Sequence, residues 1–240
     1  MKKISIMLAV MLIFSMVLAP LASAQPVLRA GNDSVPVETD GWVWVGTAEE
    51  LAYINRNQAS YLDRNIRLTS DIDMTGYDWV PIAEEATVFS GIFDGRGHRI
   101  EGLTIDGGAL QYVGFFGRVS GTIRNLGISA QVNGGSYAGV LVGHLIGGSI
   151  LNSHSQGSVT SGNTGYVSVA GGLAGAANGD STILRSSSSA AVKSGDASNQ
   201  CAGGLSVHRE RVASMTRMLP ERSRILQAIS ISMAADWPVI

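Results

Sequence analysis

The sequence predicts an all-β fold, a right-handed parallel β-helix (a β-solenoid) with a small α/β cap at its N-terminal end. Three observations lead to this prediction: a high glycine content, an internal repeat, and apolar runs that are too short for helices. The chain of 240 residues contains 30 glycines, but only 15% of its residues are charged and 6% are aromatic. Because the glycines follow no Gly-X-Y period, they indicate frequent turns and not collagen.

The first 24 residues have the pattern of a secretory signal peptide. Two lysines precede an apolar stretch over 4–18, and the small residues of 22–24 provide a cleavage site. We expect cleavage there, a linker over 25–41, and a secreted or cell-surface protein that contacts no membrane once the signal is removed. The alternative is an uncleaved membrane anchor, for which the stretch is short. The single cysteine, Cys201, excludes an internal disulfide framework.

Residues 42–106 are predicted to form an N-terminal cap and the first turns of the solenoid. The end of a solenoid exposes unpaired backbone groups, so it needs a cover. Residues 42–45 (WVWV) predict a strand, and Thr47 with Glu50 predicts a capping box that opens a helix. The apolar face of this helix includes Leu51.

Residues 107–205 contain a unit of about 26 to 33 residues that recurs with a loop of variable length. The unit has three anchors: a G/V-L/F-x-G element, an isoleucine after Ser or Thr, and a valine. The isoleucine and valine anchors recur at identical steps. The anchors of the first two types are Phe116, Gly117, Leu141, Gly143, Leu173, Gly175, Leu205, Ile123, Ile150 and Ile183. The valines are Val132, Val159 and Val192.

Each unit is predicted to consist of short strands, exemplified by YAGVLVGHL, GGSILNSHS and GSVTS. Their alternation places Leu141 and Ile150 inward and the Ser and Asn residues at corners. A unit of this size cannot bury its own apolar face, so it must stack on its neighbours, and a parallel β-solenoid is the simplest stack. The alternative is a β-sandwich whose strands are similar by chance.

The order of these motifs resembles the GLUG-motif family of bacterial secreted and surface proteins. The motifs are AEELAYIN, IRLTSDIDMTGYDWVPI, FSGIFDGRGHRIEGLTI and YVGFFGRVSGTIRNLGI, followed by G-L-x-G units, and they span about residues 42–205. The resemblance implies a right-handed β-helix on exported proteins, often beside attachment modules, with no established catalytic residues. The chain departs from the family's pattern at Val140-Leu141, where a glycine before Leu is preferred, and at Arg185-Ser186, where Asn-Ser is usual.

Residues 206–240 have the composition of an aberrant tail, with five arginines and no glycine. The possible codons for residues 233–238 can be read in a frame that starts at the third base of each codon. This frame encodes Gly first, then two residues that can be Gly, and then Leu and Ala, which restores a G-L-x-G-like anchor. We therefore expect an out-of-frame translation of further repeats, with the shift near Leu205-Ser206. The alternative is an amphipathic C-terminal tail with a helix interrupted at Pro220.

The charge of the chain bears on its partners. Residues 25–205 carry 10 basic and 16 acidic side chains, a net charge of −6. This balance gives no basic field for nucleic acid and disfavours anionic glycans and membrane surfaces. Neutral saccharides or surface proteins are the expected partners, and no cofactor is expected.

Three aspartates are weak candidates for catalysis or Ca²⁺ binding. Asp71 and Asp73 alternate on one predicted strand and Asp94 follows, and paired carboxylates are the groups that glycoside hydrolases use. With Asp78, they could supply oxygen ligands for Ca²⁺. The same aspartates stand in T-S-D-I-D and F-D-G-R-G, where turns take side-chain caps, so the sequence favours a structural role.

The remaining candidates for a chemical site are weaker still. His98, His144 and His154 lie in different units without the spacing of a metal site. The Ser-rich segment lacks a GxSxG elbow, and no helix follows GIFDGRG to make a phosphate loop. We therefore assign no catalytic, cofactor-binding or metal residue.

Two functions follow from these observations. The first is a non-catalytic secreted or cell-surface β-solenoid that serves as a structural spacer or adhesion module. The alternative is a carbohydrate-active β-helix enzyme, a polysaccharide lyase or glycoside hydrolase.

Overall fold

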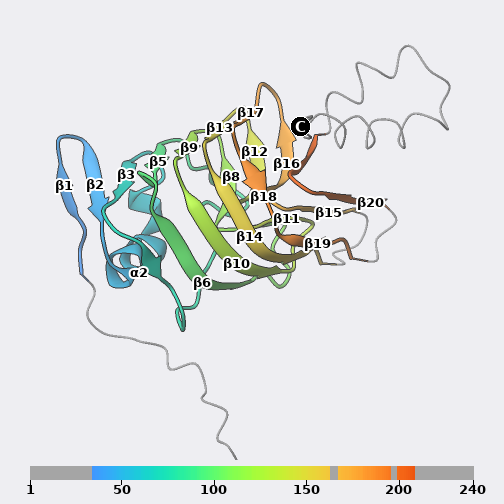
Figure 1. Cartoon of the computed structure of the whole chain (residues 1–240), viewed down its shortest axis with the longest axis horizontal. Coiled ribbons are helices and arrows are strands. Elements are labelled where there is room, and N and C mark those ends of the chain that lie inside the picture. Colours follow the sequence, from blue (N-terminus) through green and yellow to red (C-terminus); the bar gives the residue numbers. More distant parts are fainter. Residues whose placement is uncertain (1–33, 163–166, 196–198, 209–240) are drawn as a thin grey trace, which may run out of the picture.

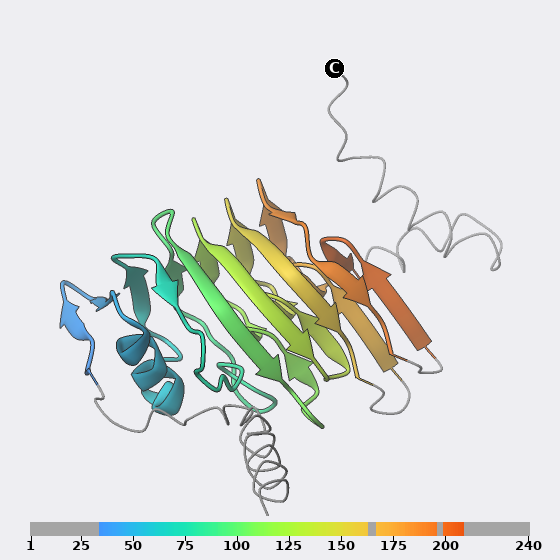
Figure 2. The same ribbon diagram turned by 60° about the horizontal axis from the view of Figure 1, so that its bottom comes forward.

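A computed structural model describes residues 34–162, 167–195 and 199–208. These residues form mostly strands, stacked as a β-solenoid of about five turns with a small helix near the N-terminal end (Figures 1 and 2). The predicted β-solenoid with an N-terminal cap is thereby confirmed. The predicted signal peptide over 1–24 and residues 209–240 of the predicted tail lie outside the described residues.

The strands form four sheets, named A to D, and every pairing is parallel except that of β1 with β2. Sheet A contains β1 (Val37–Thr39), β2 (Trp42–Val45), β3 (Asn65–Leu68), β5 (Ile92–Asp94), β9 (Thr122–Arg124), β13 (Ser149–Leu151) and β17 (Thr182–Leu184). Sheet B contains β4 (Ile72–Asp73), β6 (Arg99–Asp106), β10 (Gly127–Asn133), β14 (His154–Thr160), β18 (Ser187–Ser188) and β19 (Ala191–Lys193).

The other two sheets contain four strands each. Sheet C contains β8 (Phe116–Val119), β12 (Val142–Ile146), β16 (Ala174–Asn178) and β21 (Ser206–His208). Sheet D contains β7 (Tyr112–Val113), β11 (Tyr137–Gly139), β15 (Val167–Gly171) and β20 (Asn199–Gly203). One coil therefore runs through sheets D, C, A and B in turn, as in β11 to β14.

The isoleucine and valine anchors stack as predicted. Ile123, Ile150 and Ile183 are register partners in sheet A, and the three valine anchors are register partners in sheet B. The isoleucine anchors recur at steps of 27 and 33 residues, whereas the glycine anchors recur at steps of 26 and 32 residues. The one-residue difference lies in the turn from sheet C to sheet A. In that turn Gly147 has φ +68°, a conformation that glycine adopts without strain.

Two details of the predicted repeat were wrong. Phe116 is the register partner of Val142, so Phe115, one residue earlier, is the equivalent of Leu141. The predicted strand YAGVLVGHL is broken into β11 and β12, because the consecutive residues Val140 and Leu141 are both fully buried. Neighbouring residues of one extended strand point to opposite faces, so the chain must turn there.

The N-terminal boundary also differs from the prediction. The supposed linker over 25–41 includes β1, which pairs with β2 as a hairpin. Asp40 and Gly41 form its turn with φ +53° and +73°, the left-handed values that an Asp-Gly hairpin turn requires. This Asp-Gly signal in the sequence was missed.

The C-terminal boundary differs as well. The first residues of the predicted tail, Ser206–His208, form β21 and pair with β16. Their register shifts between Ala174 and Ala176, so Gly175 has no partner in β21. The regular repeat therefore changes close to the predicted position, although the strand continues three residues further. The frameshift stays a prediction.

The capping box predicted from the sequence is confirmed. Helix α2 (Ala48–Arg56) begins after Thr47, whose hydroxyl accepts a hydrogen bond from the Glu50 amide at 3.2 Å, while the Glu50 carboxylate accepts from the Thr47 amide at 3.2 Å. Leu51 and Ile54 are fully buried against the first coil. The short 3-10 helix η1 (Gln58–Ser60) follows.

Side chains of the cap form hydrogen bonds with backbone groups of residues 80–83, the segment that lies beside β8 at the N-terminal end of sheet C. Asn55 donates to the Val80 carbonyl at 2.6 Å, and Gln58 accepts from the Ala83 amide at 2.7 Å. Among the described residues, no strand lies beside these groups on the N-terminal side, so amide side chains take the place of a sheet partner. The cap therefore covers the edge as well as the apolar end.

Asn55→Ala should lower the free energy of unfolding by roughly 1–3 kcal/mol, because it leaves a backbone carbonyl without its partner next to a buried helix face. Urea denaturation at pH 7 measures this change. Asn57→Ala is the control, since Asn57 is exposed and donates to Tyr53 within the same helix end. An Asn55→Ala loss no larger than that of the control would contradict the capping role.

Candidate functional site

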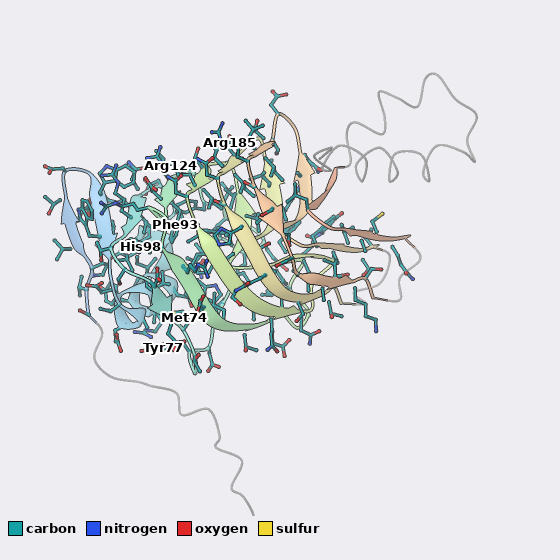
Figure 3. The ribbon with its side chains drawn as sticks, viewed as in Figure 1. Met74, Tyr77, Phe93, His98, Arg124 and Arg185 are labelled. Atoms are coloured by element: carbon teal, nitrogen blue, oxygen red, sulfur yellow. The ribbon has the colours of Figure 1, made fainter. Side chains whose placement is uncertain are left out.

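Asp71 lies exposed where sheet A leads into sheet B. Its carboxylate accepts hydrogen bonds from the Arg99 amide at 2.9 Å and pairs with His98 Nδ1 at 3.2 Å. The amide of Arg99, followed by the contact with His98, holds the pKa of Asp71 below its usual value. Asp71 therefore connects two successive coils as an ionised acceptor (His98 is labelled in Figure 3).

Asp73 caps a turn within its own coil. It accepts from the Thr75 hydroxyl at 2.6 Å and from the Thr75 amide at 2.9 Å. The hydroxyl bond, and then the amide bond, lower the pKa of Asp73. Asp78 is exposed and forms an isolated bridge with Thr104. The lowered pKa of Asp73 is the opposite of what a general acid requires.

Asp94 is the buried member of the candidate set. Its Oδ2 accepts from Arg124 Nε at 3.0 Å and Nη2 at 2.9 Å, and its Oδ1 accepts from the Asn125 side chain and the Arg96 amide at 3.0 Å each. Burial alone would raise the pKa of Asp94, but these hydrogen bonds outweigh it and keep the pKa below its usual value. Every acceptor site on this carboxylate is occupied by the fold.

The corner after Asp94 carries a polar ladder along the solenoid axis. Asn125, Asn152 and Arg185 occupy equivalent positions with φ of +53°, +48° and +48°. Asn152 donates to the Asn125 side chain at 3.1 Å, and Arg185 donates to the Asn152 side chain at 2.6 Å. Arg185 thus takes the place that asparagine has in the two preceding coils, and it still forms a hydrogen bond to the coil before it. Arg124 and Arg185 lie along the same edge in Figure 3.

The histidines and aspartates do not converge on a metal-binding arrangement in the described part of the chain. No group of three or more His, Cys, Asp or Glu side chains there is placed to hold a metal ion. His144 is stacked against Tyr112 and Tyr137, with ring centroids 5.1 and 5.8 Å apart. His98 contacts Asp71, and His154 is exposed on sheet B.

The outer face of sheet B is polar and shallow. Two depressions of about 220 and 330 Å³ run across β6, β10 and β14. Their polar lining consists mainly of the ladders Thr104, Gln131 and Ser158, and Asp106, Asn133 and Thr160. Neither depression is lined by Asp71, Asp73 or Asp94. The candidate carboxylates therefore do not share a cleft with a surface suited to a polymer.

Sheet A also carries a cluster of tryptophan and arginine side chains that the sequence patterns above did not predict. Val43 and Val45 of β2 are buried, whereas Trp42 and Trp44 project from the opposite face and are half-buried. The guanidinium of Arg67, on the adjacent β3, lies 3.5 Å from the Trp42 ring centroid. The period-two pattern WVWV, read for its outward face, was the available signal.

Comparisons with known proteins find similarity to parts of two much longer chains. A protein named as a Gly-rich membrane protein, from Evansella cellulosilytica, is 34% identical over 97 residues, which are 40% of this chain and 11% of that protein. Halomucin from Haloquadratum walsbyi is 33% identical over 146 residues, which are 55% of this chain and 2% of halomucin. This chain thus spans a small fraction of either relative.

Other comparisons add nothing to this similarity. No protein-family model matches the chain, and no solved structure matches it. Within the described residues, no helix is long and apolar enough to cross a membrane. A parallel β-solenoid fits a structural or surface module, and one of the two relatives is named as a membrane protein.

Proposed function

We propose that this chain is a non-catalytic β-solenoid module of GLUG-motif type that acts as a spacer or adhesion element of a secreted or cell-surface protein. The observation that carries the proposal is the repetition of uncharged polar side chains along the outer face of sheet B. Thr104, Gln131 and Ser158 repeat one chemistry at each coil. Repeated weak contacts along one axis suit a surface that binds neutral saccharides or another surface protein.

The predicted signal peptide and the relatives support an external location. The apolar stretch over 4–18 is typical of exported chains. The relatives named above are a Gly-rich membrane protein and halomucin. Both are many times longer than the matched segment, which is consistent with a module within a larger architecture.

The enzymatic alternative has no observation in its favour. Asp71, Asp73 and Asp94 each accept hydrogen bonds from turns or neighbouring coils. A glycosidase acid needs a raised pKa and a second carboxylate across a substrate cleft. The pKa values of these three groups are lowered.

Protease shaving of intact bacterial cells that express the chain tests its external location. We expect the solenoid in the medium or among the peptides released from the surface, with a mature N-terminus at Gln25. A variant that lacks residues 2–24 is the matched control and should stay in the cytosol. Cytosolic retention of the complete chain would overturn the proposal.

Incubation of the purified chain with plant and bacterial polysaccharides tests the absence of catalysis. We expect neither new reducing ends nor unsaturated products. Conversion of any polymer that is lost on Asp71→Asn or Asp94→Asn, in variants that remain folded by circular dichroism, would establish the enzyme instead.

A further inference from the structure

The outer face of sheet A at the capped end carries aromatic rings covered by cations. Arg67 lies 3.5 Å from the Trp42 centroid and 5.6 Å from the Trp44 centroid. Arg96, which is exposed, lies 5.6 Å from the Trp44 centroid. We call Trp42, Trp44, Arg67 and Arg96 the Trp-Arg face. Its four side chains come from β2, β3 and the turn after β5, so the fold and not local sequence assembles it.

The arginines of the Trp-Arg face have no carboxylate partner among the described residues. Asp94 is the register partner of Arg67 in sheet A, but its ion pair is with Arg124. Arg64, at the start of the same region, pairs with Glu38 at 2.8 Å. Neither Arg67 nor Arg96 forms an ion pair within the described ranges. Two guanidinium groups therefore remain uncompensated on one face.

Several exposed acidic residues lie on another face of the solenoid. Asp73, Glu101 and Asp106 lie exposed on the strands of sheet B. The net charge of −6 over residues 25–205 is an average over the chain. It does not exclude an anionic glycan at the Trp-Arg face, because exposed charges act over about one Debye length, roughly 8–10 Å at moderate salt.

We propose that the Trp-Arg face binds an acidic polysaccharide through its carboxylate groups. A guanidinium that contacts an indole ring can still donate two hydrogen bonds from its terminal N–H groups to a carboxylate. Arg67 covers the Trp42 ring, so the half-buried Trp44, whose centroid lies 5.6 Å from either guanidinium, is the indole that offers apolar surface to the carbon face of a sugar ring. The two requirements together, paired donors and flat rings, distinguish a uronic-acid polymer from a simple polyanion.

This inference rests on the proposed external location, since extracellular polymers are the ligands that such a module meets. It names a different partner from the neutral saccharides expected from whole-chain charge, and a different face from the polar ladders of sheet B. Binding by the purified chain is measured without reference to export, so its failure and that of the proposed location are distinguishable.

Affinity electrophoresis and calorimetry with polygalacturonate, at low salt and again at high salt, test the inference. We expect binding that weakens as salt rises, with little retardation by the neutral polymer dextran. Arg96→Gln and Arg67→Gln should each weaken binding about tenfold. The matched control is Arg99→Gln, which removes the same charge from an exposed position on sheet B and should bind like the parent chain.

Three results would overturn the inference. One is the absence of polygalacturonate binding, and another is equal loss of binding in the Arg96→Gln and Arg99→Gln chains. The third is binding of polyglutamate as tight as that of polygalacturonate, which would assign the face to acidic proteins. Because Arg96 is exposed, Arg96→Gln should melt like the parent chain, so lost binding in this variant reports on the face and not on unfolding.

Discussion

Gly143→Ala should lower the free energy of unfolding by about 3 kcal/mol or more, at the upper end of the cost of overpacking. A Cβ at Gly143 would lie 2.6 Å from the Val113 amide nitrogen, 2.8 Å from the Tyr112 carbonyl carbon and 2.9 Å from the Gly117 carbonyl oxygen. All three are backbone atoms of the preceding coil. A side chain can rotate away from such a contact, but a backbone held by sheet hydrogen bonds cannot.

Gly204→Ala provides the matched control, because Gly204 belongs to the same recurring anchor. A Cβ at Gly204 would meet no atom within 4 Å, and we expect a change within about 0.5 kcal/mol. Urea denaturation of both variants, with the slope of the transition checked against the parent chain, gives the comparison. Equal stability of the two variants would show that the backbone of sheet D does not exclude a side chain at Gly143 in sheet C.

The close approach of sheets C and D explains which part of the repeat could be predicted. A Cβ on Gly117 or Gly175 would also lie within 2.7 Å of backbone atoms of neighbouring segments, so glycine is required at these three successive coils and the pattern is visible in the sequence. The isoleucine anchors are visible for a similar reason, since each fills the same place in the core. Anchor positions that accept only one type of residue can therefore be found from the sequence without a structure.

The split between sheets D and C was missed in the coil where the turn consists of Val140 and Leu141, although the equivalent turns of other coils carry Gly114, Gly172 and Gly204. Tertiary packing buries both residues and makes the turn that local sequence does not signal. The same limit affects Phe115 and Phe116, whose adjacent aromatic rings leave the register ambiguous. In the structure Phe115 stacks on Trp79 at 4.5 Å, and Phe116 contacts Phe89 at 4.8 Å.

The candidate sites divide in the same way. Turn-capping by Asp73 was predictable, since the acceptor and its donors lie two residues apart. The partners of Asp94 in the next coil, and the approach of Arg67 to Trp42, join residues that are more than twenty positions apart. The register between coils determines such contacts. The sequence pattern predicts this register for the anchor residues, but it does not predict which outward side chains come into contact.

Asp94→Ala should lower the free energy of unfolding at pH 7 by about 2–3 kcal/mol, which is below the range for a fully buried ion pair because the Arg124 side chain is 36% exposed. The side chain of Asp94 is 8% exposed. Its loss leaves Arg124, the Asn125 amide group and the Arg96 backbone without their acceptor. These donors hold the corner between sheets A and B across two coils, so the whole edge of the first complete coils should loosen.

The pH dependence of this loss separates the ion pair from simple packing. Because the pKa of Asp94 is lowered in the folded state, its stabilising contribution is present above the unfolded pKa of about 3.9 and is lost as pH falls through the folded value. The stability difference between the parent chain and Asp94→Ala should therefore shrink below about pH 4. Asp73→Ala, which removes an exposed turn cap, should lower the free energy of unfolding at pH 7 clearly less than Asp94→Ala. A difference for Asp94→Ala that stays constant down to pH 2, or one as small as that of Asp73→Ala, would show that the buried ion pair does not hold this corner.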